Sequence, residues 1–191
     1  MKIELKYKTP MDWAEGVVDA MDRFLPDHAA AEKKASSMAM TMVSHYPDRP
    51  ELVAAMVDLA IEELNHFRAV VKLMQERGLH LLPDEKDPYV NELRKSIRTG
   101  KDLFFMDRLL VAGIIEARGA ERFGMVADVL PGGPLKKFYR SITQSEEGHE
   151  TLFIDLAELY FDPGVTRLRL EQLLETEADI ISGLPLRPAL H

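Results

Sequence analysis

Apolar residues recur at alternating intervals of three and four along four long stretches of this chain, which is the spacing of one face of an α-helix. The alternation of Val, Ile, Thr and Tyr that is typical of strands is almost absent after the first eight residues. Proline and glycine separate the stretches, for example at Pro47, at Gly78 and between Pro131 and Pro134. The pattern therefore predicts an all-helical protein.

Capping residues and helix breakers set the expected ends of the helices. A short first helix is expected to end near Pro26, with Asp27 capping the next one. We expect helices at residues 11–24, 27–45, 48–77, 89–98, 102–130, 135–161 and 165–182. Four of these are long, and a longer central connection separates the two pairs, which predicts a four-helix bundle with additional short N-terminal and C-terminal helices. At 191 residues, the chain is expected to form one domain, 1–191.

Each of the four long helices carries one glutamate inside its apolar stripe, and these are Glu32, Glu63, Glu116 and Glu146. A buried glutamate is costly unless it is paired or bound to a metal. Two of the four are followed three residues later by a histidine, as Glu63-Leu-Asn-His66 and Glu146-Glu-Gly-His149. Residues at that spacing lie on one face of a helix, so a carboxylate and an imidazole can converge on one ion.

The order of these residues occurs twice, which is more specific than a single Glu-x-x-His match. Glu32 precedes Glu63 by 31 residues and Glu116 precedes Glu146 by 30. One Glu from each of two helices and one Glu-x-x-His from each of the other two form the ligand pattern of ferritin-like di-iron and di-manganese bundles. The sequence thus predicts a ferritin-like dinuclear centre, and carboxylate with imidazole favours iron or manganese over copper without separating the two. Its expected ligands are Glu32, Glu63, His66, Glu116, Glu146 and His149.

Neighbouring polar residues receive simpler interpretations. The helix around Glu32 is more polar than the others, so a different rotation could expose this residue. Four glutamates lie off the stripes and are interpreted as surface or supporting groups: Glu62, Glu121, Glu147 and Glu150. Four histidines are interpreted as lacking a carboxylate partner at helical spacing: His28, His45, His80 and His191. Tyr139, one heptad before Glu146, is expected to be a core residue, and a redox role remains open.

The chain contains no cysteine, which excludes disulfides, cysteine-ligated zinc, iron–sulfur clusters and thiolate catalysis. Any metal must therefore be held by histidine and carboxylate. No run approaches the roughly 18 apolar residues that a membrane-spanning helix needs. The first eight residues contain no apolar stretch of signal-peptide length, so we expect a cytoplasmic protein without a membrane partner.

Charge is distributed unevenly along the chain. The formal net charge is −8, yet residues 94–140 hold ten basic and five acidic groups, which leaves −13 for the remainder. A basic face for nucleic-acid phosphates is one interpretation, and ordinary solvated helix faces are the other. The candidate phosphate-binding residues are Arg94, Lys95, Arg98, Lys101, Lys136, Lys137 and Arg140.

The segments around the ligands resemble those of a known family. They read Ala-Ala-Glu32-Lys-Lys-Ala, Ile-Glu62-Glu63-Leu-Asn-His66-Phe, Ile-Ile-Glu116-Ala-Arg-Gly-Ala-Glu121-Arg and Ser-Glu146-Glu147-Gly-His149-Glu150. With its length and extra first helix, the whole chain resembles the bacterial tRNA 2-methylthio-N6-isopentenyladenosine hydroxylases. The resemblance implies a nonheme di-iron monooxygenase that uses O2 and two external electrons. It would hydroxylate the isopentenyl group of a modified adenosine beside the tRNA anticodon.

The resemblance also implies roles for individual residues. One iron is expected near Glu32, Glu63 and His66 and the other near Glu116, Glu146 and His149, with Glu63 and Glu146 bridging them as catalytic residues. The expected partners are tRNA and a separate reductase or ferredoxin, because the chain has no cysteine for an iron–sulfur relay. A monomer or a small homo-oligomer is expected.

Two other functions share the bundle. Iron storage or ferroxidase activity is disfavoured because the second Glu-x-x-His is intact. Hydroxylation of a quinone-like molecule is disfavoured because residues 165–182 are acidic, whereas a membrane-binding face would be basic and apolar.

Overall fold

The computed structural model describes residues 2–191, and this range contains seven α-helices and no strand. The helices are α1 (Met11–Asp19), α2 (Met21–His45), α3 (Pro50–Glu76), α4 (Pro88–Arg94), α5 (Lys101–Val129), α6 (Pro134–Tyr160) and α7 (Pro163–Gly183). The all-helical prediction is confirmed. From α3 onward each helix begins within two residues of its expected start, and the largest difference at an end is at α4, which stops at Arg94 rather than residue 98.

The residues group into two compact units. The first, called the α2–α3 unit, contains Gly16–Glu85 and Pro188–Leu190. The second, called the α5–α6 unit, contains the N-terminal segment up to Glu15, then Lys86–Arg187 and His191. The boundary between them falls inside α1. The expectation of a single domain stays a prediction.

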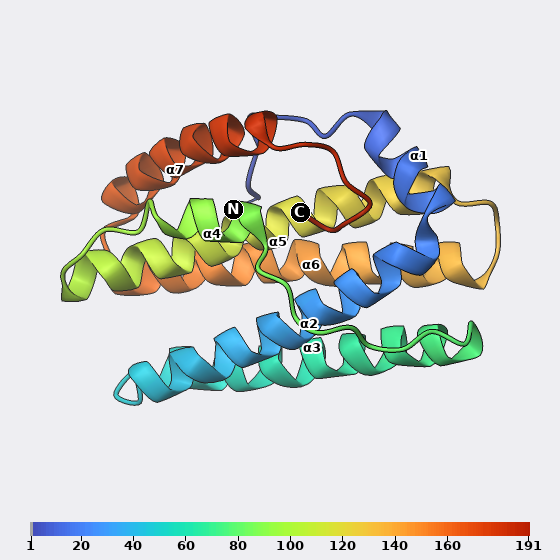
Figure 1. Ribbon diagram of the computed structural model, residues 1–191. Coiled ribbons are helices and arrows are strands. Elements are labelled where there is room, and N and C mark those ends of the chain that lie inside the picture. The colour runs from blue at the N-terminus through green and yellow to red at the C-terminus, as the bar shows by residue number, and fades with distance from the viewer. Residues whose placement is uncertain (1) are drawn as a thin grey trace. The chain divides into compact units, whose positions relative to one another are not determined.

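In the α2–α3 unit, two long helices pair as a hairpin (Figure 1). Pro50 begins α3 at a position where its missing N–H costs no hydrogen bond. The hydroxyl of Ser36 on α2 donates to the carbonyl oxygen of Ala60 on α3 at 2.9 Å, which fixes the register between the helices. Further along the chain, Asp84 accepts from Lys33 at 2.7 Å, so the segment after α3 returns along α2.

The break between α1 and α2 does not coincide with Pro26. The expected end of the first helix near Pro26 is wrong, because Pro26 lies inside α2 and the break falls at Ala20. Ala20 has φ −113° and ψ 33°, outside the helical region. A proline in the second turn removes one helical hydrogen bond, and the fully buried side chains of Phe24 and Leu25 hold the helix together around it.

In the α5–α6 unit, α5 and α6 pack very closely (Figure 1). A Cβ added to Gly113 on α5 would lie 3.3 Å from Cβ of Phe153 and 3.4 Å from the carbonyl oxygen of Glu150, both on α6. Helices α4 and α7 and the N-terminal segment cover other faces of α5. Most of the side chains of α5 are therefore buried.

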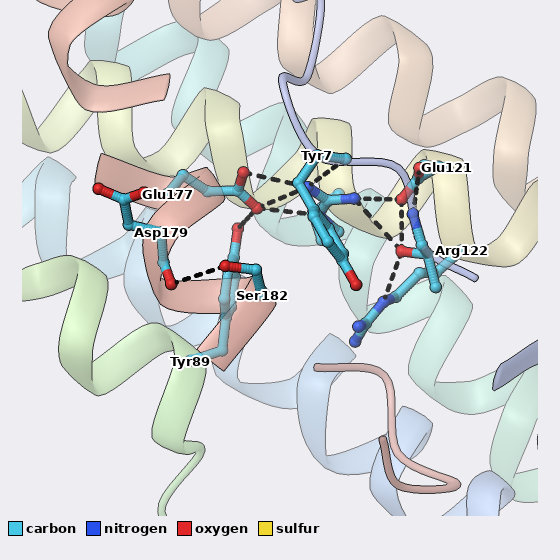
Figure 2. Close-up of polar contacts among 9 residues, drawn as sticks. Tyr7, Tyr89, Glu121, Arg122, Glu177, Asp179 and Ser182 are labelled. Atoms are coloured by element: carbon cyan, nitrogen blue, oxygen red, sulfur yellow. Dashed lines mark hydrogen bonds and ion pairs between the residues drawn. The ribbon is translucent and has the colours of Figure 1, made fainter. Parts of the chain in front are cut away.

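A buried polar network connects these covering elements to α5 (Figure 2). Arg118 on α5 and Glu177 on α7 are fully buried, with Nε to Oε1 at 2.9 Å and Nη2 to Oε2 at 3.0 Å. The hydroxyl of Tyr89 on α4 donates to Glu177 at 3.1 Å, and Arg118 also donates to the main-chain oxygen of Tyr7 at 3.0 Å. Glu121 forms a second ion pair with Arg118. The network joins four segments that lie far apart in the sequence.

Replacing Glu177 with Gln should lower the stability of the protein markedly. The change leaves most of the shape but removes one charge from a fully buried ion pair, which costs about 3–5 kcal/mol. Urea denaturation should show this as a lower free energy of unfolding. The control is Glu158→Gln, whose pair with Arg167 is partly exposed and contributes about 0–1 kcal/mol. Equal effects of the two variants would contradict the role of the network.

Candidate metal centre

The α2–α3 unit holds the first cluster of predicted ligands. Glu63 and His66 lie one turn apart on α3, and Glu32 faces them from α2. The ligand atoms of the three residues lie within 4.8 Å of one another. His66 Nδ1 is 3.6 Å from Glu32 Oε2 and 3.7 Å from Glu63 Oε2. The alternative rotation that would expose Glu32 is not observed, since Glu32 is only 3% exposed.

The α5–α6 unit holds the second cluster, built in the same way. Glu146 and His149 lie one turn apart on α6, and Glu116 faces them from α5. His149 Nδ1 is 3.6 Å from Glu146 Oε2 and 3.9 Å from Glu116 Oε2. Gly119 follows Glu116 on the same face, and a Cβ there would come within 3.9 Å of Glu146 Oε2. That distance is an ordinary van der Waals contact, so the backbone of α5 passes close to this carboxylate.

Both clusters have the chemistry and spacing of metal ligands. Their nitrogen–oxygen separations of 3.6–3.9 Å are longer than a hydrogen bond. Bonds of about 2 Å to a shared ion would place two ligand atoms about 3–4 Å apart. Glu63 is 1% exposed and Glu146 4%, so these carboxylates require a counter-charge in the interior. The donor sets fit divalent cations.

The electrostatics of the first cluster also favour positive charge. Burial opposes a charged His66, but the carboxylates of Glu32 and Glu63 outweigh it and raise the pKa of His66 to about 9. Burial likewise opposes a charged Glu32, yet the neighbouring His28 and His66 together lower its pKa below the usual range. Glu32 is therefore ionised at neutral pH, as a carboxylate that binds a metal must be.

His28 has a role that the sequence interpretation missed. Its Nε2 lies 2.5 Å from Glu32 Oε1, so the expectation that His28 lacks a carboxylate partner is wrong. The sequence contained enough information to predict this pair, because His28 and Glu32 are four residues apart on one helix. Hydrogen-bonding one oxygen of Glu32 orients the carboxylate and leaves Oε2 facing His66.

The other polar neighbours agree with their simple interpretations. Glu62 and Glu147 are exposed. Glu150 accepts from the main-chain N–H of Ile3 at 3.3 Å, and Glu121 accepts from Thr9, so both hold the N-terminal segment in place. His45 and His80 are largely solvent-accessible, whereas His191 is paired at 3.0 Å with Asp87, which is distant in the sequence rather than at helical spacing. Tyr139 is fully buried, with its ring centroid 5.8 Å from that of Phe123, as expected of a core residue.

Some of the candidate phosphate-binding residues already form hydrogen bonds or ion pairs with other residues of the protein. Arg98 binds Asp107 with two hydrogen bonds from its side chain, and Lys136 donates to the carbonyl oxygen of Leu130 at the end of α5. Lys95 pairs with Glu92, and Arg140 with Asp128. Exposed positions are occupied by Arg94, Lys101 and Lys137.

These residues form two patches rather than one. Lys101 begins α5, and Lys136 and Lys137 follow its other end, so about 40 Å of helix separates them. Arg118 and Arg122, which contribute to the basic balance of residues 94–140, are buried. The role of the seven residues in binding nucleic acid stays a prediction.

A solved structure places the protein in a class. "Protein 43 with aldehyde deformylating oxygenase activity" from Synechococcus matches with a TM-score of 0.93 and 34% identity, covering 99% of this chain and 96% of that one. Across residues 2–191, seven helices and two clusters of Glu with Glu-x-x-His define a ferritin-like protein of the di-iron carboxylate type, which confirms the expected fold class. Within the described residues, no helix is long and apolar enough to cross a membrane.

Sequence comparison assigns the chain to one family within this class. Residues 1–191 match the family described as tRNA-(MS[2]IO[6]A)-hydroxylase (MiaE), and the chain belongs to this family. The tRNA 2-(methylsulfanyl)-N(6)-isopentenyladenosine(37) hydroxylase of Pseudomonas putida is 32% identical over 175 residues, which are 92% of this chain and 85% of that protein. The enzyme of the same description from Salmonella typhimurium is 33% identical over 156 residues, 82% of this chain and 57% of that protein.

Replacing His28 with Phe should weaken metal binding without unfolding α2. The aromatic ring can keep its contact with Phe24, but the hydrogen bond that orients Glu32 is lost. Loss of such a supporting bond lowers metal affinity about 10- to 100-fold. Titration with a divalent ion, with helical content followed by circular dichroism, measures both effects. His45→Phe on the same helix is the control, and unchanged affinity in His28→Phe would refute the supporting role.

Proposed function

We propose that this protein is an O2-dependent di-iron monooxygenase that hydroxylates the isopentenyl group of 2-methylthio-N6-isopentenyladenosine next to the anticodon of tRNA. The observation that carries the proposal is the pair of buried Glu, Glu-x-x-His clusters in a chain of the tRNA hydroxylase family. The names of two relatives, each about one-third identical, support the same substrate.

The two clusters are proposed to form one dinuclear centre. Each supplies two carboxylates and one imidazole, and neither set of three fills the coordination sphere of an iron ion by itself. Four carboxylates balance the charge of two divalent ions. Glu63 and Glu146, the carboxylates of the two Glu-x-x-His motifs, are proposed to bridge the ions. Each ion would then retain positions that protein side chains do not occupy.

The side chains contribute by holding and shielding the metals. When bound, two irons supply the activation of O2 that an unactivated C–H bond requires, because such a bond offers no acidic proton to a side-chain base. His28 orients the carboxylate of Glu32. The low exposure of Glu63, Glu146 and His149 keeps bulk water from the ligands and limits side reactions.

The electrons must come from outside the chain. Hydroxylation with O2 consumes two electrons beyond those of the substrate, and the chain has no cysteine for an iron–sulfur cluster. We therefore propose a separate reductase or ferredoxin as a partner. A cytoplasmic location and a monomer or small homo-oligomer are proposed to accompany this function.

The tRNA is proposed to contact two separated basic patches. Lys101 lies at one end of the α5–α6 unit and Lys137 at the other, and an RNA stem is long enough to span such a distance. The modified adenosine lies in a single-stranded loop, so its base can be unstacked toward the metals at small energetic cost.

Metal content should depend on the six ligands and not on exposed residues that make no contact with them. Protein purified without chelator should contain about two irons per chain, and Glu63→Ala or His149→Ala should lose metal because a buried ligand is removed. Elemental analysis measures the content. Glu147→Ala, at an exposed position next to Glu146, is the matched control. Full occupancy in the ligand variants would refute the assignment.

The activity itself has a direct test. tRNA that carries the isopentenyl modification, incubated with the iron-loaded protein, a ferredoxin system and O2, should yield a nucleoside heavier by one oxygen atom. Use of ¹⁸O2 should place the label in that product, as hydroxylation by O2 requires. Glu146→Ala should abolish the product and Glu147→Ala should preserve it. An unmodified nucleoside profile with fully loaded protein would refute the tRNA substrate.

A second candidate function has a specific observation in its favour. The Synechococcus protein described as having aldehyde deformylating oxygenase activity is as similar to this chain as the two tRNA hydroxylases are. The same loaded protein should therefore be incubated with a long-chain aldehyde. Formation of an alkane and formate, without oxygen transfer to tRNA, would replace the proposed function with this one.

A further inference from the structure

A small pocket lies beside the buried network of the α5–α6 unit. Its volume is about 90 Å³, comparable to three molecules of liquid water and sufficient for one phosphate group. Four polar residues line it: Tyr7 from the N-terminal segment, Arg122 from α5, and Arg187 and His191 from the segment after α7. Its apolar walls are formed by Pro88, Ile181, Leu184, Pro185 and Leu186. None of these residues belongs to the candidate metal centre.

Arg122 is fixed in position at the wall of this pocket. It is only 3% exposed, its guanidinium lies 4.8 Å from the ring centroid of Trp13, and its Nε donates to Thr9 Oγ1 at 3.4 Å. In Figure 2 its guanidinium and the hydroxyl of Tyr7 point to the same side of the network. Burial, and then the charge of Arg118, lower the pKa of Arg122 to about 10. An anion beside this guanidinium would offset both effects.

His191 presents a buried nitrogen at the same pocket. Its side chain is 6% exposed, and its ring stacks on Tyr89 with 4.9 Å between centroids. Nδ1 lies 3.0 Å from Asp87 Oδ2, and because a carboxylate only accepts, Nδ1 carries the proton. Among residues 2–191, the buried Nε2 has no hydrogen-bond partner. A buried polar atom in this state indicates a ligand or water that completes its hydrogen bonding.

The position of His191 is determined by the protein around it. Arg187 donates to its main-chain oxygen at 3.1 Å, while Asp87 and Tyr89 hold the ring. Asp87 also accepts from the N–H of Val90 at the start of α4, and this bond and His191 help to lower the pKa of Asp87 to about 2 despite burial, which raises it. Asp87 is thus ionised throughout the physiological range, and Nε2 is held toward the pocket.

We propose that this pocket is a phosphate-binding site in which the guanidinium of Arg122, the hydroxyl of Tyr7 and Nε2 of His191 bind the phosphate oxygens. A guanidinium presents a planar set of N–H groups that matches an oxyanion, and a phenol adds a neutral donor. Nε2 can accept from a P–OH group, or donate to an anionic oxygen when the ring is protonated. Free inorganic phosphate and the terminal phosphate of an RNA both present this chemistry. The site does not depend on the proposed tRNA hydroxylation.

Isothermal titration calorimetry of the full chain with inorganic phosphate tests the site. One saturable site per chain is expected below about 10 mM, where even a millimolar affinity would be detected. His191→Phe retains the stack on Tyr89 but removes Nε2, and Arg122→Gln removes the charge. Each should weaken binding about tenfold or more, the effect of losing a charge-assisted hydrogen bond. Lys72→Gln, an exposed position in the α2–α3 unit, should bind as the unaltered protein does.

The outcomes separate the possibilities. Absence of saturable binding, or equal binding by the unaltered protein and His191→Phe, overturns the proposal. If circular dichroism shows that Arg122→Gln has lost helical content, the phosphate affinity of His191→Phe alone tests the proposal. Parallel titrations with a short RNA bearing a 5′-phosphate and the same RNA with a 5′-hydroxyl identify the source. Preference for the phosphorylated RNA that is lost in His191→Phe assigns an RNA phosphate, and binding of inorganic phosphate alone assigns the free ion.

Discussion

The requirement that every buried carboxylate have a counter-charge determines most of what is distinctive in this protein. Glu32, Glu63, Glu116 and Glu146 lie on buried faces of their helices, where an uncompensated charge would cost far more than the stability of a typical domain. The α5–α6 pair offers its two glutamates one histidine, and the α2–α3 pair offers His66 together with His28, which binds Glu32. A neutral imidazole does not cancel the charge of a carboxylate, so each cluster is suited to a divalent cation.

The protein neutralises buried acids in a second way, and the two ways differ in geometry. Glu177 is bound by Arg118 and Asp107 by Arg98 and Arg169, with nitrogen–oxygen distances of 2.7–3.0 Å. In the two clusters the corresponding distances are 3.6–3.9 Å. In a structural ion pair the two side chains are within hydrogen-bonding distance of each other. Side chains that bind a common metal ion are farther apart, because the ion lies between their ligand atoms.

The sequence predicted what is local and missed what depends on distant partners. Proline and glycine between helices marked most boundaries, and the spacing of each Glu to its His was enough to find both clusters. The helix end predicted near Pro26 was wrong because two buried hydrophobic side chains keep α2 intact at this proline. The basic balance of residues 94–140 overstated the surface charge, because Arg118 pairs with Glu177, 59 residues away. Periodicity along one helix carries no information about such a partner.

The metal ligands by themselves do not select the substrate. Relatives described as tRNA hydroxylases and a structure described as having aldehyde deformylating activity stand at nearly the same identity, 32–34%. A shared donor set provides the oxidising chemistry, and specificity must come from residues that contact the rest of the substrate. In this chain the cationic groups that could meet an RNA lie outside the clusters, at Lys101 and Lys137 and in the pocket of Arg122. An aldehyde needs none of these positive charges, whereas a polyanionic RNA gains affinity from each one, so the effect of neutralising them on catalysis distinguishes the two substrates.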